Sequence, residues 1–309
     1  MKHSGWLVPV LTIVLFVSGQ AQVYAQEDSL CQDSSTLRKG RLAGVVSAEA
    51  ALAALTLVGL NELWYKDYPR SSFHFFNDNK EWLQMDKMGH AYTAYELSSL
   101  SFSALKWCGV KDKPAVWYGT ATGLAYQLII EMLDAFSTEW GFSWGDFSAN
   151  VAGGAIFATQ QLLWKDQKIV PKFSYHYSPY AKMRPELLGS NAMERVIKDY
   201  NGQTYWLSVS PGAFIKPQKK FPRWIAVSIG YSADGMLGAE SNHVSGYPAY
   251  VDYCRARRFL LSLDIDFKRI PVKNKTLKTI FALINTLKVP FPALEYNTCK
   301  GWSGHYFYH

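Results

Sequence analysis

Three short clusters of ionisable and polar residues lie beside long apolar segments of this sequence. They are Asp86-Lys87-Met88-Gly89-His90, then Glu131 with Asp134, and then Ser143-Trp144-Gly145-Asp146 with Asn150 and Gly153-Gly154. Ionisable groups next to apolar segments are costly unless they are paired or functional. These clusters are therefore the residues whose types and spacing could support chemistry or binding.

The first two clusters have the spacing of one helix face. Asp86 and His90 are four residues apart, and Asp86 suits the dipole at a helix start. Glu131 and Asp134 are three apart at a predicted helix end, where carboxylates oppose the dipole. A cation such as Lys87 or a protonated His90 could compensate them. A helix cap and a core histidine are the structural alternative for Asp86 and His90.

The third cluster marks the start of another predicted helix. Ser143 could cap it, with Asp146 as the N3 partner of a variant capping box. Asp146 and Asn150 share a face at a spacing of four. Gly153 and Gly154 follow one turn later, and glycines there permit close approach between helices.

Antiparallel packing of successive helices would bring the three clusters to one end of a bundle. The combined set could bind a divalent metal through oxygen and nitrogen ligands from Asp86, His90, Glu131, Asp134 and Asp146. A hydrolase would use His90 as general base with a carboxylate orienting it. A buried ion-pair network is the structural alternative. The sequence contains no nucleophile elbow, HExxH motif or P-loop, so no named enzyme class receives direct support.

Four apolar segments that could form helices follow one another after Arg38. They cover approximately residues 41–63, 87–107, 114–134 and 147–164. Each is close to the roughly 20 residues that cross a hydrocarbon core, although none is purely apolar. We predict a four-helix membrane-associated bundle over residues 38–165, with a water-soluble bundle as the alternative.

The pattern changes to a period of two in the second half of the chain. Residues 204–210, 223–231 and 257–267 alternate, residues 276–287 have helical spacing, and residues 291–296 are again extended. In 257–267 the large apolar side chains face one way, whereas Ser262, Asp264 and Asp266 face the other. The alternation indicates a half-solvated or lipid-facing sheet. We predict an α+β fold with a small antiparallel β-rich region over residues 186–309.

The N-terminus has the form of a secretion signal. A short basic start and an apolar core predict a signal peptide over residues 1–25, cleaved after Ala25, and a polar leader over 26–37. Lipidation at Cys31 is the alternative. Four cysteines without CxxC spacing make a metal cluster improbable. Export permits a disulfide, and Cys254–Cys299 is the pair that we consider.

Composition favours a membrane surface as the partner. Aromatic residues make up 15% of the 309 residues, including 11 Trp and 19 Tyr, and the formal net charge is +7. Amphipathic rings favour the headgroup zone of a bilayer, and a positive charge suits anionic lipid. A nucleic-acid partner is not expected, because no basic run is interleaved with a known nucleic-acid module.

Over roughly residues 84–160 the chain resembles two families. Asp86-Lys87-x-x-His90, Glu131-x-x-Asp134 and the stretch from Gly141 through Asp146 to Gly153 are similar to the uncharacterised YfiM-like family of predicted periplasmic lipoproteins. The same arrangement also resembles VanZ-type membrane proteins, which are linked to glycopeptide tolerance. The chain differs from the short YfiM-like members, because it lacks a small residue before Cys31 and continues for more than a hundred residues, as longer Bacteroidetes-type versions do. Both resemblances imply a cell-envelope setting.

We therefore expect a cell-envelope protein at the periplasmic face or outer membrane rather than the inner membrane. The leading interpretation is a non-enzymatic module for binding envelope lipid or glycolipid, or for envelope assembly. Its polar pocket would comprise Asp86, Lys87, His90, Glu131, Asp134, Ser143, Asp146 and Asn150. A metal-assisted hydrolase or transferase acting on such a lipid is one alternative. A scaffold for other envelope proteins is another.

Overall fold

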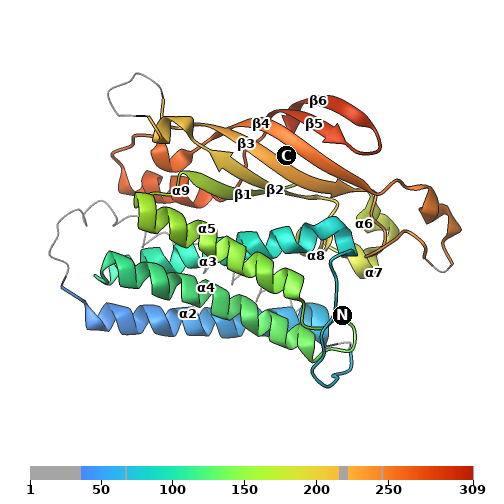
Figure 1. Ribbon diagram of the computed structural model, residues 1–309, viewed down its shortest axis with the longest axis horizontal. Helices are drawn as coiled ribbons and strands as arrows, with labels where there is room; N and C mark the ends of the chain where they lie inside the picture. The colour runs from blue at the N-terminus through green and yellow to red at the C-terminus, as the bar shows by residue number, and fades with distance from the viewer. Residues whose placement is uncertain (1–35, 67, 216–221, 245, 309) are drawn as a thin grey trace. The chain divides into compact units, whose positions relative to one another are not determined.

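The computed structural model describes residues 36–66, 68–215, 222–244 and 246–308, and within them it has an α+β fold (Figure 1). These residues form eight α-helices and a six-stranded antiparallel sheet. The chain divides into two compact units. The helical unit holds residues up to Asn77, Thr93–Asp166 and Val272–Leu283, and the sheet unit holds Asp78–Tyr92, Gln167–Pro271 and Ile284–His309.

Helices form at all four predicted apolar segments. They are α2 (Lys39–Leu60), α3 (Met85–Trp107), α4 (Asp112–Ala135) and α5 (Trp144–Trp164). A turn of π-helix, Asn61–Tyr65, continues α2. Helix α3 contributes to both units, because residues 85–92 cluster with the sheet and residues 93–107 with the other helices.

Small residues set the spacing between helices in the helical unit. A Cβ atom added at Gly119 of α4 would lie 2.7 Å from the backbone nitrogen of Phe102 in α3. At Gly123 it would lie 2.6 Å from Oγ of Ser98. Only glycine therefore allows α4 to approach α3 this closely. Glycine also allows close packing of α5 against α4, although with more room, since a Cβ at Gly154 would be 3.2 Å from Leu124.

Helix α2 is apolar and mostly uncovered. Among the described residues, Lys39–Tyr65 is the one helix long and apolar enough to cross a membrane, and only 6% of its most apolar window is buried. Its hydroxyl at Thr56 accepts a hydrogen bond from Tyr126 of α4 at 2.8 Å. Val46 and Val58 are more than half exposed. Because so little of its apolar surface is buried, α2 does not form the core of the helical unit.

The six strands follow one another in chain order across the sheet (Figure 1). They are β1 (Ile169–Tyr175), β2 (Gln203–Val209), β3 (Ile225–Asp234), β4 (Ala256–Ile265), β5 (Phe291–Asn297) and β6 (Gly301–Tyr308). Three short helices lie between β1 and β2, namely α6 (Tyr180–Met183), α7 (Pro185–Leu188) and α8 (Ala192–Lys198). Helix α9 (Lys275–Ile284) confirms the helical spacing predicted before β5. The sheet begins at Ile169, earlier than the expected start at residue 186.

The sheet has its polar residues inside and its apolar residues outside. Ser228, Ser262 and Asp264 lie on one face and are 0–4% exposed. On the other face, Ile229 and Leu261 are directly opposite each other and are 59% and 49% exposed. Antiparallel sheets commonly bury their apolar face and solvate the polar one. Strands β3–β6 reverse that arrangement.

The inward face curls so that strands distant in the sheet meet. Thr204 of β2 and Tyr308 of β6 are 3.4 Å apart at their hydroxyls, although three strands separate β2 from β6. The rings of Trp206 and Tyr308 are in edge contact, with centroids 5.7 Å apart. Leu260 and Ala293 complete this buried cluster. The curl encloses the polar side chains of the inward face.

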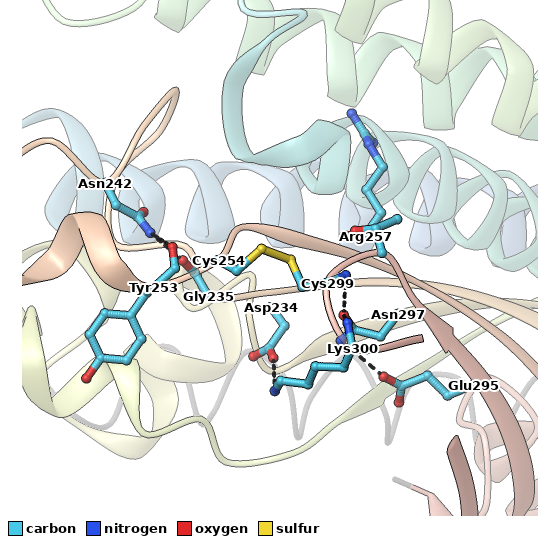
Figure 2. The surroundings of a disulfide bond; sticks show 11 residues. Asp234, Gly235, Asn242, Tyr253, Cys254, Arg257, Glu295, Asn297, Cys299 and Lys300 are labelled. Carbon is cyan, nitrogen blue, oxygen red and sulfur yellow. Dashed lines mark hydrogen bonds and ion pairs between the residues drawn. A yellow bond between two sulfur atoms is a disulfide. The ribbon is translucent and has the colours of Figure 1, made fainter. Parts of the chain in front are cut away.

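A disulfide bond joins the loop before β4 to the turn between β5 and β6. It links Cys254 and Cys299, whose Cα atoms are 6.4 Å apart, and confirms the predicted pair (Figure 2). Beside it, Lys300 forms an ion pair with Asp234 at 3.4 Å. Cys108 is a buried free thiol.

The predicted signal peptide, most of the leader and Cys31 lie outside the described residues.

Candidate functional site

The junction between α4 and α5 holds one predicted group of polar residues. Ser143 is the N-cap of α5, and its hydroxyl accepts a hydrogen bond from the backbone N–H of Asp146 at 3.1 Å, which confirms the predicted cap. The carboxylate of Glu131, 1% exposed, accepts from the backbone N–H of Ser143 at 3.3 Å. This bond offsets the unfavourable position of Glu131 near a helix end. Glu131 and Ser143 therefore fasten the end of α4 to the start of α5.

Two further bonds extend this group within the helical unit. The side-chain amide of Gln127 donates to Oδ1 of Asn150 at 2.8 Å, with both residues 2% exposed. The hydroxyl of Tyr65, in the π-helical turn after α2, donates to Asp134 at 2.6 Å. Gln127 was not among the predicted site residues. Its position four residues before Glu131, on the same helix face, was the available signal.

The Asp86-Lys87-x-x-His90 motif lies at the start of α3 and belongs to the sheet unit. His90 and Asp86 are 3.8 Å apart at their nearest nitrogen and oxygen atoms. The hydroxyl of Tyr200 donates to Asp86 at 2.7 Å. Lys87 forms an ion pair of 2.8 Å with Asp78, and each side chain is only 13% exposed. The Lys87 charge is therefore neutralised by a local carboxylate.

Gly89 in the middle of this motif has a packing role. A Cβ atom at this position would be 2.9 Å from the hydroxyl oxygen of Tyr205 on β2. Met85 and Tyr205 form a buried cluster, against which Tyr92 and Phe173 pack. The start of α3 thus covers the apolar face of β1 and β2. Tyr231 of β3 also packs against this cluster and donates a hydrogen bond to the backbone of Leu83, whereas Phe259, Tyr296 and Trp302 on the same face of β4–β6 are exposed.

Acidic residues gather around this helix start. Burial and the negative charges of Asp78, Asp86 and Glu240 raise the pKa of Glu81 to about 7, and Lys87 opposes the rise. A carboxyl group with this pKa changes its charge near neutral pH. Of the predicted polar residues, Asp86, Lys87 and His90 belong to the sheet unit, and Glu131, Asp134, Ser143, Asp146 and Asn150 belong to the helical unit.

The sheet encloses a charged group that sequence reasoning did not find. Asp264 pairs with Lys172 at 3.0 Å and lies 3.9 Å from Lys288, and all three side chains are at most 1% exposed. The hydroxyls of Ser208 and Ser228 donate to the same carboxylate at 2.7 and 3.0 Å. Two cations around one buried carboxylate leave an excess positive charge. Such a group is costly unless each charge is well partnered.

This excess charge predicts a pH dependence of stability. Burial lowers the pKa of Lys288 to about 8, and Lys172 adds to the lowering while Asp264 opposes it. The unfolded chain therefore holds the Lys288 proton to higher pH than the folded one. Stability must rise between about pH 8 and the unfolded value near 10.4. We expect the unfolding free energy of the wild type, relative to Lys288→Met, to rise by about 3 kcal/mol across this window.

Urea titrations of both proteins in mild detergent, followed by near-ultraviolet circular dichroism, measure this difference. Comparing the two removes the titration of the tyrosines, which both proteins share. Parallel pH profiles for wild type and Lys288→Met would show that the pKa of Lys288 is the same in the folded and unfolded states, which would contradict the lowered value.

Comparison with known proteins finds one family model that matches part of the chain. Residues 74–162, which cover α3, α4 and most of α5, match the family described as predicted periplasmic lipoprotein (DUF2279). No curated protein and no solved structure matches the chain. The match supports an exported protein of the cell envelope, at the periplasmic face or the outer membrane.

Proposed function

We propose that this envelope protein is a non-enzymatic, membrane-associated module that binds envelope lipid, with α2 as its membrane helix. The observation that carries the proposal is the 27-residue apolar helix Lys39–Tyr65, whose most apolar window is almost entirely uncovered. Exposed apolar surface of this kind is stable in hydrocarbon and costly in water. On this proposal, α2 to α5 form the membrane-associated bundle that the sequence predicts.

The polar groups support a binding or assembly role more than catalysis. Ser143 caps α5, Glu131 fastens two helices together and Lys87 is held in an ion pair. Each of these side chains has a structural task. The resemblance to YfiM-like and VanZ-like proteins agrees with this proposal, because both imply a cell-envelope setting. Asp86 accepts a hydrogen bond from Tyr200 and lies 3.8 Å from His90, and we assign this pair to a polar headgroup.

Lysines placed in α2 test the proposal. Each lysine near the centre of a membrane helix costs about 2.5–3.5 kcal/mol, so Val46→Lys with Leu55→Lys should lower membrane partition by roughly a thousandfold or more. Carbonate extraction of membranes measures the result. We expect the wild type to stay in the pellet and the double variant to move to the supernatant.

A matched control separates this effect from added charge alone. Val196 and Val251 are 38% and 46% exposed in the sheet unit. Val196→Lys with Val251→Lys adds the same charge outside the helix and should leave the protein in the pellet. Complete carbonate extraction of the wild type would refute the role of α2.

A further inference from the structure

The apolar outward face of β3–β6 carries an ordered row of aromatic side chains, of which Tyr231 is partly buried and the other three are exposed. Tyr231, Phe259, Tyr296 and Trp302 stand opposite one another on successive strands. Ring centroids are 5.6 Å apart for Tyr231 and Phe259, and 5.1 Å apart for Tyr296 and Trp302. Phe259 is 47% exposed and Trp302 is 70% exposed. The register, rather than chance, therefore places four rings in line across the sheet.

Aliphatic rows follow the aromatic row along the strands. The next row contains Ile229, Leu261 and Leu294, and the one after it pairs Val227 with Leu263. All five side chains are at least 36% exposed. Rows of aliphatic side chains next to a row of tyrosine and tryptophan are typical of protein surfaces in contact with a bilayer.

Charge is distributed to suit anionic lipid. The carboxylates within β3–β6 are Asp234, Asp264 and Glu295, and all three occupy the inward register positions. Exposed basic residues lie at both ends of the face. Arg223 and Lys268 lie at one end, and Lys300, which also pairs with Asp234 at 3.4 Å, follows β5 beside the aromatic row. Basic residues near a membrane surface are attracted to anionic headgroups.

We propose that this face of β3–β6 is a second membrane contact, which binds the surface of an anionic phospholipid bilayer. From the aromatic row to Ile225 the face extends about 20 Å, which is shorter than a hydrocarbon core of roughly 30 Å. It therefore binds at one surface rather than crossing the bilayer. The inward face provides the reason for the reversed pattern, because the polar groups are satisfied inside the sheet and the apolar groups are left for lipid.

Site-specific photo-crosslinking tests the contact in the full-length chain. The photoreactive residue 4-benzoylphenylalanine replaces Phe259 or Trp302 in protein reconstituted into vesicles of phosphatidylglycerol and phosphatidylcholine. Tyr177 is 50% exposed in the sheet unit but lies outside the strands, and it serves as the matched control position. We expect lipid adducts at 259 and 302 to exceed those at 177 by at least tenfold. Vesicles of phosphatidylcholine alone should reduce the adducts severalfold.

A double variant on the apolar face tests whether the lipid adducts depend on that face. Leu261→Asp with Leu263→Asp changes only exposed side chains, so the fold should persist while the adducts at 302 fall about tenfold. The proposal rests on the proposed function only for its membrane setting, and the two can fail separately. Carbonate-resistant protein without lipid adducts at 259 and 302 would overturn this contact and leave α2 as the membrane helix. Adducts to a second copy of the chain would overturn it in favour of a dimer interface.

Discussion

Asp264→Asn is expected to lower the stability of the sheet unit by about 3–5 kcal/mol. Asp264 lies 3.0 Å from Lys172 and 3.9 Å from Lys288, and these three side chains are at most 1% exposed. Removing the carboxylate charge leaves two buried ammonium groups without an opposite charge. Hydrogen exchange of the β3 and β4 amides measures the opening free energy locally, without requiring the whole chain to unfold in one step.

Asp234→Asn is the matched control for this prediction. Asp234 pairs with Lys300 at 3.4 Å, but the side chains are 20% and 74% exposed. Exposed ion pairs contribute about 0–1 kcal/mol. We therefore expect Asp264→Asn to lower the opening free energy clearly more than Asp234→Asn does. Equal losses would mean that the Asp264 group is either hydrated or already neutral.

Alanine at both Gly119 and Gly123 is expected to separate α3 from α4. A Cβ at either position would lie less than 3.0 Å from atoms of α3, including the backbone of Phe102 and the carbonyl oxygen of Ala94. Backbone cannot rotate away as a flexible side chain can, so the helices must move apart. Overpacking of this kind costs about 1–3 kcal/mol for each substitution. Thermal melting followed by far-ultraviolet circular dichroism measures the loss.

Gly44 and Gly59 of α2 supply the control for this pair. No atom lies within 4 Å of a Cβ built at either position. Alanine there should leave stability unchanged or raise it by up to about 1 kcal/mol through helix propensity. Similar behaviour of the two pairs would show that α3 and α4 are not held at this distance by glycine.

The long helices could be predicted from sequence because they are long and continuously apolar. Strands β2 to β5 could be predicted because their residues alternate with a period of two. Strand β1 was missed because Pro171 and Lys172 interrupt its apolar run, and proline demotes a strand prediction. Strand β6 was missed because Gly301 and Gly304 hide its alternation.

The candidate site could be predicted less completely than the helices. The cap at Ser143 follows from local spacing, and it was predictable for that reason. The burial of Asp264 was not, because its partners Lys172 and Lys288 lie on segments remote in sequence. The same alternation in β4 is compatible with a polar face in water or enclosed inside the sheet. The positions of Lys172 and Lys288 in the fold decide whether Asp264 is solvated or enclosed.

The close approach of α4 to α3 could also have been predicted from the glycine spacing in α4. Gly119 and Gly123 have the small-x-x-x-small spacing of closely packed membrane helices. Gly153 and Gly154 were the predicted packing glycines, and a Cβ at Gly154 would lie 3.2 Å from Leu124 and Thr120 of α4, closer than an ordinary van der Waals contact.

Native mass spectrometry of the full-length protein, purified in mild detergent, tests whether the protein binds envelope lipid through α2. We expect the wild type to retain phospholipid or glycolipid adducts, and Val46→Lys with Leu55→Lys to lose most of them while remaining folded. A lipid-free wild type carrying one divalent metal, together with chelator-sensitive hydrolysis of an envelope lipid, would refute this lipid-binding role. It would establish the metal-assisted enzyme instead.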